Sequence, residues 1–69
     1  MSADNAIFVK YIDGTYYVRE GVLSCLDEYS ENWFRGGEAF ETENRAYQYA
    51  EQMFENRTIV EYGIWPVEQ

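Results

Sequence analysis

The chain has 69 residues and a formal net charge of −8, because 13 Asp and Glu side chains face five Lys and Arg side chains and there is no histidine. A field of this sign repels nucleic acid and anionic membranes and attracts basic protein surfaces, so it disfavours direct nucleic-acid binding and membrane attachment. The length allows one domain, residues 1–69, whose thin core gains apolar area from 2 Trp, 7 Tyr and 4 Phe residues.

The first predicted element is a β-hairpin. Residues 6–12 are rich in β-branched and aromatic side chains, Asp13-Gly14 is a strong two-residue turn signal, and residues 15–20 form the returning strand. Such a turn sets the pairs Ile12–Thr15, Tyr11–Tyr16 and Val9–Val18. One face then meets a helix through Ile7, Val9, Tyr11, Tyr16 and Val18. The other face carries Phe8, Lys10, Ile12, Tyr17 and Arg19 and is not cleanly polar. We therefore expect either that it is partly covered or that it is an exposed surface that binds other molecules.

Residues 22–34 allow two interpretations after Gly21, which we expect to end the strand. A short helix is favoured by an approximate apolar stripe of Val22, Leu23, Leu26, Tyr29, Trp33 and Phe34. A strand over residues 22–26 followed by a loop is the alternative. Residues 35–37, Arg-Gly-Gly, indicate a turn, and residues 38–41 fit a short edge strand.

The best-specified element is a helix over residues 42–56. Its apolar positions recur at helical spacing and comprise Ala46, Tyr47, Ala50, Met53 and Phe54. Its polar face comprises Glu43, Gln48, Glu51, Gln52 and Glu55. The Thr42 hydroxyl can cap the start, while Glu43 in the first turn and Arg57 after the last turn suit the helix dipole.

The alternating pattern predicts the last strand over residues 58–64, with Val60, Tyr62 and Ile64 on one face. Gly63 weakens this strand or marks a bulge, and Pro66 bars it from the sheet centre beyond Trp65. The order of elements predicts an α+β fold, in which a small antiparallel β-sheet of three to four strands is packed by one main amphipathic helix, with a second short helix possible.

Enzyme chemistry is poorly represented in this sequence. Without histidine there is no Ser-His-Asp or Cys-His arrangement, and no glycine-rich phosphate loop is present. Three acids, Asp27, Glu28 and Glu31, could ligate Ca²⁺, but the calcium-loop pattern is missing. We therefore expect no enzymatic activity, no catalytic residue, no metal and no cofactor.

The single cysteine and the N-terminus bear on the cellular compartment. Cys25 cannot form an internal disulfide, and we interpret it as a buried small apolar residue in a reducing cytosol. Residues 1–5 lack the regions of a signal peptide, and no stretch reaches the roughly 20 apolar residues of a membrane helix.

The carboxylates form the candidate binding surface. Like charges four residues apart destabilise a helix by about 0.2–0.5 kcal/mol per pair, so their repetition indicates either solubilisation or a partner. Duplex DNA carries about one charge per 1.7 Å of axis, and a line of carboxylates can occupy a cationic groove built for it. Tyr29, Trp33 and Phe34 could add apolar anchors, although we expect two of the three to be core. The candidate partner-binding residues are Asp27, Glu28, Glu31, Glu38, Glu41, Glu43, Glu51 and Glu55.

Both termini carry a resemblance to known proteins. The opening Ser2-Ala3-Asp4-Asn5-Ala6-Ile7-Phe8-Val9 is similar to that of small phage-borne proteins beginning Ser-Ala-(Asp/Asn)-Asn-Gly-Ile-Tyr, with Ala6 in place of the glycine. The same group is matched in order by Tyr17-Val18, by Phe40-Glu41-Thr42 leading into Ala46 and Ala50, and by Glu61-Tyr62-Gly63-Ile64. The middle of the chain has no clear match.

Within such phage proteins, the size, acidity and aromatic content resemble the anti-CRISPR inhibitors, including those acting on type I-C systems. The resemblance implies a non-enzymatic protein of the host bacterial cytoplasm, and we expect it to be a monomer. It would bind a CRISPR effector complex of the Cascade type and block target DNA binding through an acidic DNA-mimic surface. Two rivals are a phage accessory protein that binds another basic host protein, and an assembly protein that dimerises through its aromatic sheet face.

Overall fold

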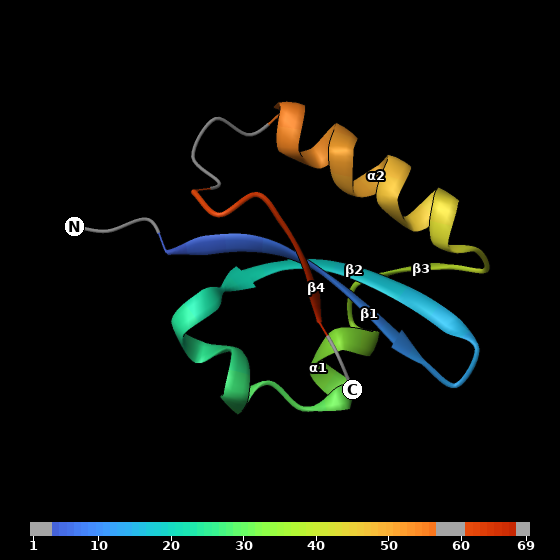
Figure 1. Cartoon of the computed structure of the whole chain (residues 1–69). Coiled ribbons are helices and arrows are strands. Elements are labelled where there is room, and N and C mark those ends of the chain that lie inside the picture. The colour runs from blue at the N-terminus through green and yellow to red at the C-terminus, as the bar shows by residue number, and fades with distance from the viewer. Residues whose placement is uncertain (1–3, 57–60, 68–69) are drawn as a thin grey trace.

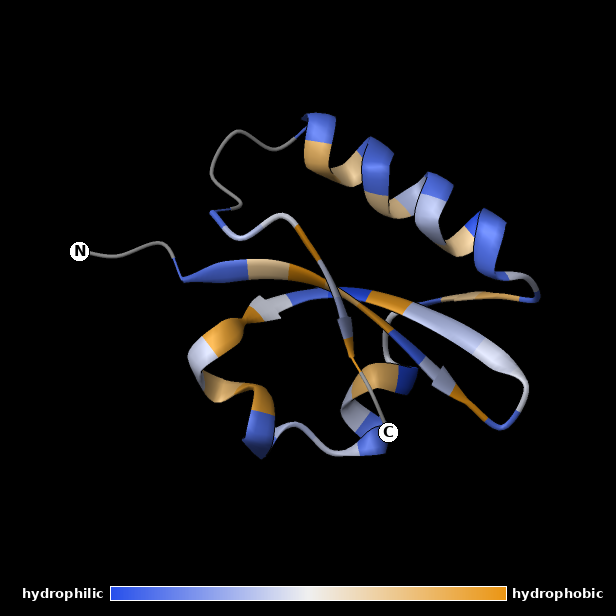
Figure 2. Ribbon diagram, in the orientation of Figure 1, coloured by the Kyte–Doolittle hydropathy of each residue, from blue (hydrophilic) through white to orange (hydrophobic). Residues whose placement is uncertain are grey.

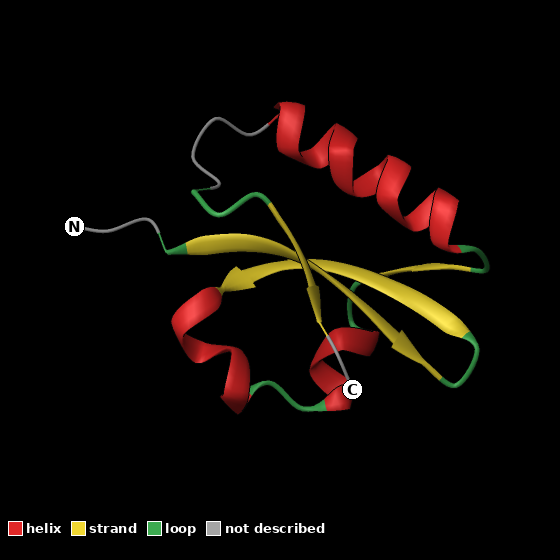
Figure 3. Ribbon diagram, viewed as in Figure 1, coloured by secondary structure: helices red, strands yellow, loops and turns green. Residues whose placement is uncertain are grey.

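The computed structural model describes residues 4–56 and 61–67, which form a four-stranded mixed β-sheet with helices on both faces (Figure 1). The elements follow the order β1 (Asn5–Ile12), β2 (Thr15–Val22), η1 (Leu23–Glu28), α1 (Glu31–Arg35), β3 (Glu38–Phe40), α2 (Glu43–Asn56) and β4 (Ile64–Val67). The strand order is β3-β2-β1-β4, with α2 over one face and η1 and α1 over the other (Figures 1 and 3). The predicted α+β fold is confirmed. The Cα radius of gyration of 11.3 Å matches the about 11 Å expected of a compact chain of this length.

The predicted hairpin is confirmed in both turn and register. Asp13 and Gly14 both have positive φ angles, 52° and 86°, as a two-residue turn between right-twisted strands requires. Ile12 pairs with Thr15, and the register continues to Asn5 opposite Val22. The prediction that Gly21 ends the strand is wrong, because β2 continues to Val22.

Gly21 stays in the strand because two rings pack directly against its backbone. A Cβ atom at this position would lie 2.7 Å from Cη2 of Trp33 and 2.9 Å from Cε2 of Phe8. Glycine therefore marks a close approach of side chains onto the sheet rather than a break in it.

The last strand differs from its prediction in position and direction. Within the described residues it begins at Ile64 and runs through Pro66, while Arg57 and Val60 lie outside them. It pairs parallel with β1, Ile7 opposite Ile64, so the sheet is mixed rather than wholly antiparallel. The reason is that α2 carries the chain back along the sheet after β3, so β4 starts from the same end as β1.

The two faces of the sheet have separate apolar cores. The face predicted to meet the main helix does so, since Ile7, Val9 and Val18 pack with Ala46 and Ala50 of α2. Tyr16 also packs there, whereas Tyr11 is exposed. Hydrophilic residues lie along the outer side of α2 (Figure 2).

The opposite face is covered, which settles the alternatives left open for it. Ala6, Phe8 and Ile12 of the sheet are buried there with Phe34 of α1. The rival prediction of dimerisation through the aromatic sheet face rested on Phe8, Ile12 and Tyr17, and within this part of the face Phe8 and Ile12 are buried and Tyr17 is half-buried.

Two short helices replace the single helix expected over residues 22–34, and the alternative strand over 22–26 is found only at Val22. The helical structure is interrupted at Tyr29 and Ser30, where the Ser30 hydroxyl accepts a hydrogen bond from the Trp33 N–H at 3.3 Å and caps α1.

Two single-residue predictions can also be compared with the structure. Cys25 is half-buried rather than buried. The predicted Thr42 cap is confirmed, since the Arg45 N–H donates to its Oγ1 at 3.2 Å.

Candidate functional site

The structure divides the eight candidate acids into two groups, although all eight are exposed. Three lie on the face formed by η1 and α1: Asp27, Glu28 and Glu31. The others lie on or next to β3 and α2: Glu38, Glu41, Glu43, Glu51 and Glu55. The sheet lies between these two helical layers, so the acids of η1 and α1 and those of α2 lie on opposite sides of it (Figure 1).

Most of these carboxylates have no cation beside them in the described part of the chain. Both ion pairs found there belong to Arg35, whose Nη2 lies 2.9 Å from Asp13 Oδ2 and 3.9 Å from Glu31 Oε1. Seven of the eight candidate acids, all but Glu31, therefore have no intramolecular ion pair among residues 4–56 and 61–67. Exposed carboxylates of this kind are free to meet an external cation.

Two of the described cations are held by aromatic rings instead of carboxylates. The Arg19 Cζ atom lies 4.2 Å from the centroid of the Trp33 ring, and its guanidinium donates to the Trp33 carbonyl oxygen. The Lys10 Nζ atom lies 5.5 Å from the centroid of the Phe34 ring. Such cation–π contacts keep these charges on the protein surface without neutralising any carboxylate.

The aromatic residues considered as anchors are part of the packing. Tyr29 and Trp33 stack with ring centroids 3.7 Å apart and an interplanar angle of 10°, and Phe34 is buried edge-on to Trp33. The Tyr29 hydroxyl also accepts a hydrogen bond from the Val22 N–H at 3.0 Å. We expected two of the three in the core, and all three pack there, with Tyr29 and Trp33 only partly buried.

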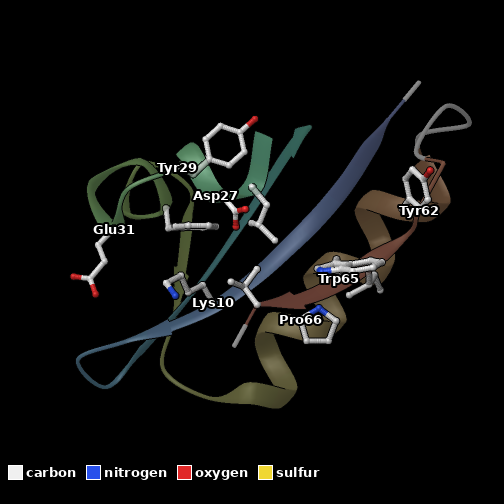
Figure 4. A pocket seen from close by; sticks show the side chains of 11 residues that line it. Lys10, Asp27, Tyr29, Glu31, Tyr62, Trp65 and Pro66 are labelled. Atoms are coloured by element: carbon white, nitrogen blue, oxygen red, sulfur yellow. The ribbon is translucent and has the colours of Figure 1, made fainter. Parts of the chain in front are cut away.

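A groove of about 900 Å³ opens between the η1–α1 layer and β4 (Figure 4). The sheet register builds its floor, because Trp65 pairs with Phe8 and Val67 pairs with Lys10, which places these four residues on the same face. Its lining includes Lys10, Asp27, Tyr29, Phe34, Tyr62 and Trp65.

Sequence reasoning missed this groove because it depends on β4 lying parallel beside β1. The signal in the sequence was a pair of large aromatics, Tyr62 and Trp65, close together near the end of the last predicted strand. Tyr62 is 47% exposed and Trp65 is 38% exposed, and their rings meet edge-on at 6.4 Å. An exposed aromatic pair at the mouth of a groove is typical of a binding site.

One titratable group on α2 departs from its ordinary behaviour. Partial burial raises the pKa of the Tyr47 hydroxyl, and the nearby Glu43 carboxylate and Tyr16 raise it further. The group lies at the start of the helix and is not part of the groove.

The described residues, 4–56 and 61–67, also bear on metal binding and on membrane crossing. Nowhere in that part of the chain do three or more His, Cys, Asp or Glu side chains come together as a potential metal site. None of its helices is long and apolar enough to cross a membrane.

Comparisons with known proteins do not place the chain in a family. No protein-family model matches the sequence, and neither the curated proteins nor the solved structures give a significant match.

Proposed function

We propose that this protein is a phage-encoded anti-CRISPR inhibitor that acts in the host bacterial cytoplasm. It binds the cationic DNA-binding surface of a Cascade-type effector complex and prevents target DNA from binding there. The observation that supports this proposal is the set of seven exposed carboxylates that have no ion pair among the described residues, on a chain of net charge −8. Carboxylates left unpaired in this way act on a basic surface as DNA phosphates do.

The two-sided distribution of the acids favours a cleft over a flat surface as the binding partner. The group on η1 and α1 and the group around α2 lie on opposite sides of the sheet. A channel lined with lysines and arginines can contact both groups at once, as it would contact the two backbones of a duplex.

The direct test is target DNA binding by a purified Cascade-type effector, with and without the protein. We expect inhibition to weaken when either acid group is altered, by Glu28→Lys with Glu31→Lys on one face or by Glu51→Gln with Glu55→Gln on the other. A matched variant of α2 that keeps the charge, Gln48→Ala with Gln52→Ala, should inhibit as the parent does. Unchanged DNA binding in the presence of excess parent protein would reject the proposal.

The same acidic surface suits other basic host proteins, so a capture experiment accompanies the test. The immobilised protein should retain Cascade subunits from a host lysate, and added salt should release them. Retention of a nuclease or polymerase subunit in place of Cascade subunits would indicate that this subunit, and not Cascade, is the target.

A further inference from the structure

We propose that the groove between η1–α1 and β4 is a binding site for an arginine side chain of a partner protein. The inference rests on the proposed function, since the cationic partner would be the one that the acidic surface meets. It goes further in naming the place and the chemistry of recognition. It also predicts that the exposed aromatic pair, and not the acids alone, determines the contact.

The aromatic walls supply the first element of recognition. Tyr29 and Asp27 lie on the η1–α1 side of the groove, and Tyr62 and Trp65 lie on the β4 side (Figure 4). The ring faces of Trp and Tyr attract a guanidinium group, which is planar and weakly hydrated.

The charge of the groove supplies the second element. Its lining holds two carboxylates, Asp27 and Glu31, and one ammonium group, Lys10, so its sum is negative. Glu31 is 3.9 Å from Arg35, whereas Asp27 has no ion pair among the described residues. Lys10 lies over the Phe34 ring, and no ion pair joins it to Asp27. A cationic guest is therefore favoured over an anionic one, and Asp27 is the carboxylate that would pair with it.

The outer edge of β4 favours binding of a partner's side chain in the groove over pairing of a partner's strand with the sheet. The Ile7 N–H donates to the Gly63 carbonyl oxygen, and the alternation of a parallel ladder then turns the backbone groups of Ile64 and Pro66 away from β1. Pro66 has no N–H, so the outer edge of β4 offers one backbone donor, that of Ile64. Such an edge cannot pair well with an extended peptide.

The test uses the full chain and a capped short peptide with one central arginine, followed by two-dimensional NMR. We expect shift changes concentrated on Trp65, including its indole N–H, and on Asp27 and Tyr62. Matched peptides with citrulline or glutamate in place of arginine should bind more weakly. Tighter binding of the glutamate peptide, or shift changes centred on α2, would overturn the proposal.

Three variants separate the contributions. Trp65→Leu keeps apolar area but removes the ring face, and we expect it to weaken arginine-peptide binding by about three- to thirtyfold. Asp27→Asn should weaken it by about two- to fivefold. Glu55→Gln removes one exposed charge from α2 and should change the affinity by less than about 1.5-fold. Equal losses in Asp27→Asn and Glu55→Gln would mean that the general field of the protein, and not the groove, holds the peptide.

Failure of this inference can be told apart from failure of the proposed function. If Trp65→Leu still inhibits effector DNA binding fully while the acid variants do not, the groove has no part in the inhibition. If the arginine peptide binds the groove but DNA binding by the effector is unaffected, the arginine site is supported and the effector is rejected as the partner.

Discussion

At the scale of single residues, the least expected finding is the use of Gly21 inside a strand. The sequence pattern around this glycine predicts a strand end, because glycine is weak in strands and no side chain is there to pack. What keeps it in β2 is the Trp33 ring, which comes from another part of the chain and lies against its backbone. Such a contact between distant residues cannot be read from local spacing.

Gly21→Ala should therefore destabilise the fold by about 1–3 kcal/mol, because the new methyl group would meet the Trp33 and Phe8 rings. Urea unfolding followed by far-UV circular dichroism measures the change. In a protein that already carries Trp33→Leu, adding Gly21→Ala should cost less stability than it does in the parent, because the obstructing ring is gone. A Gly21→Ala protein as stable as the parent would show that the rings do not pack on this glycine.

Tyr47 makes stability depend on alkaline pH. Its pKa is raised in the folded state by burial first and by Glu43 and Tyr16 next. The unfolded chain then loses this proton at a lower pH than the folded chain does. The contribution of Tyr47 is thus fully present below the ordinary tyrosine pKa of about 10, and it falls as the pH rises from there through the folded pKa.

We expect Tyr47→Phe to lose less stability than the parent between about pH 9 and about pH 11. Urea midpoints at the two pH values measure the difference. Glu43→Gln should produce the same trend to a smaller extent, because it removes only a secondary cause. Tyr62→Phe, at an exposed ring, is the matched control and should follow the parent.

At the scale of elements, local signals predicted what local interactions build. The Asp13-Gly14 turn and the apolar spacing of α2 with its Thr42 cap need only neighbouring residues, and both are present as predicted. The direction of β4 and the covering of the second sheet face depend on where distant segments meet. The groove depends on both, which is why the sequence pointed to Asp27, Glu31 and Tyr29 on its η1–α1 side but not to Tyr62 and Trp65 on its β4 side.

The Thr42 cap offers a test of how much α2 depends on its own start. Thr42→Ala removes the acceptor for the Arg45 N–H and should cost about 1 kcal/mol of stability. Thr42→Ser keeps the hydroxyl and should restore most of it. Thermal unfolding of the three proteins measures the effect, and an Ala variant equal to the Ser variant would mean that water satisfies the N–H equally well.

At the scale of the whole molecule, the acidic charge acts on folding and on partner binding in opposite directions. Thirteen carboxylates outnumber five cations and repel one another in the compact state, while Arg35 pairs with Asp13 and Glu31. Screening this repulsion stabilises the fold, whereas screening the attraction to a basic partner weakens the complex. The net charge is evident from the sequence alone, but the distribution of the acids over two sides of the sheet could be seen only in the fold.

Raising NaCl from about 10 mM to about 200 mM shortens the Debye length from about 30 Å to less than about 8 Å. We expect the melting temperature of the free protein to rise over this range, while its affinity for a cationic partner falls. The Glu51→Gln, Glu55→Gln variant should be more stable than the parent at low salt, because like charges four residues apart cost a helix about 0.2–0.5 kcal/mol. Its melting temperature should also rise less with salt. A melting temperature independent of salt in the parent would mean that the carboxylates lie too far apart to repel, and the attraction to a partner would then have to come from the aromatic groove.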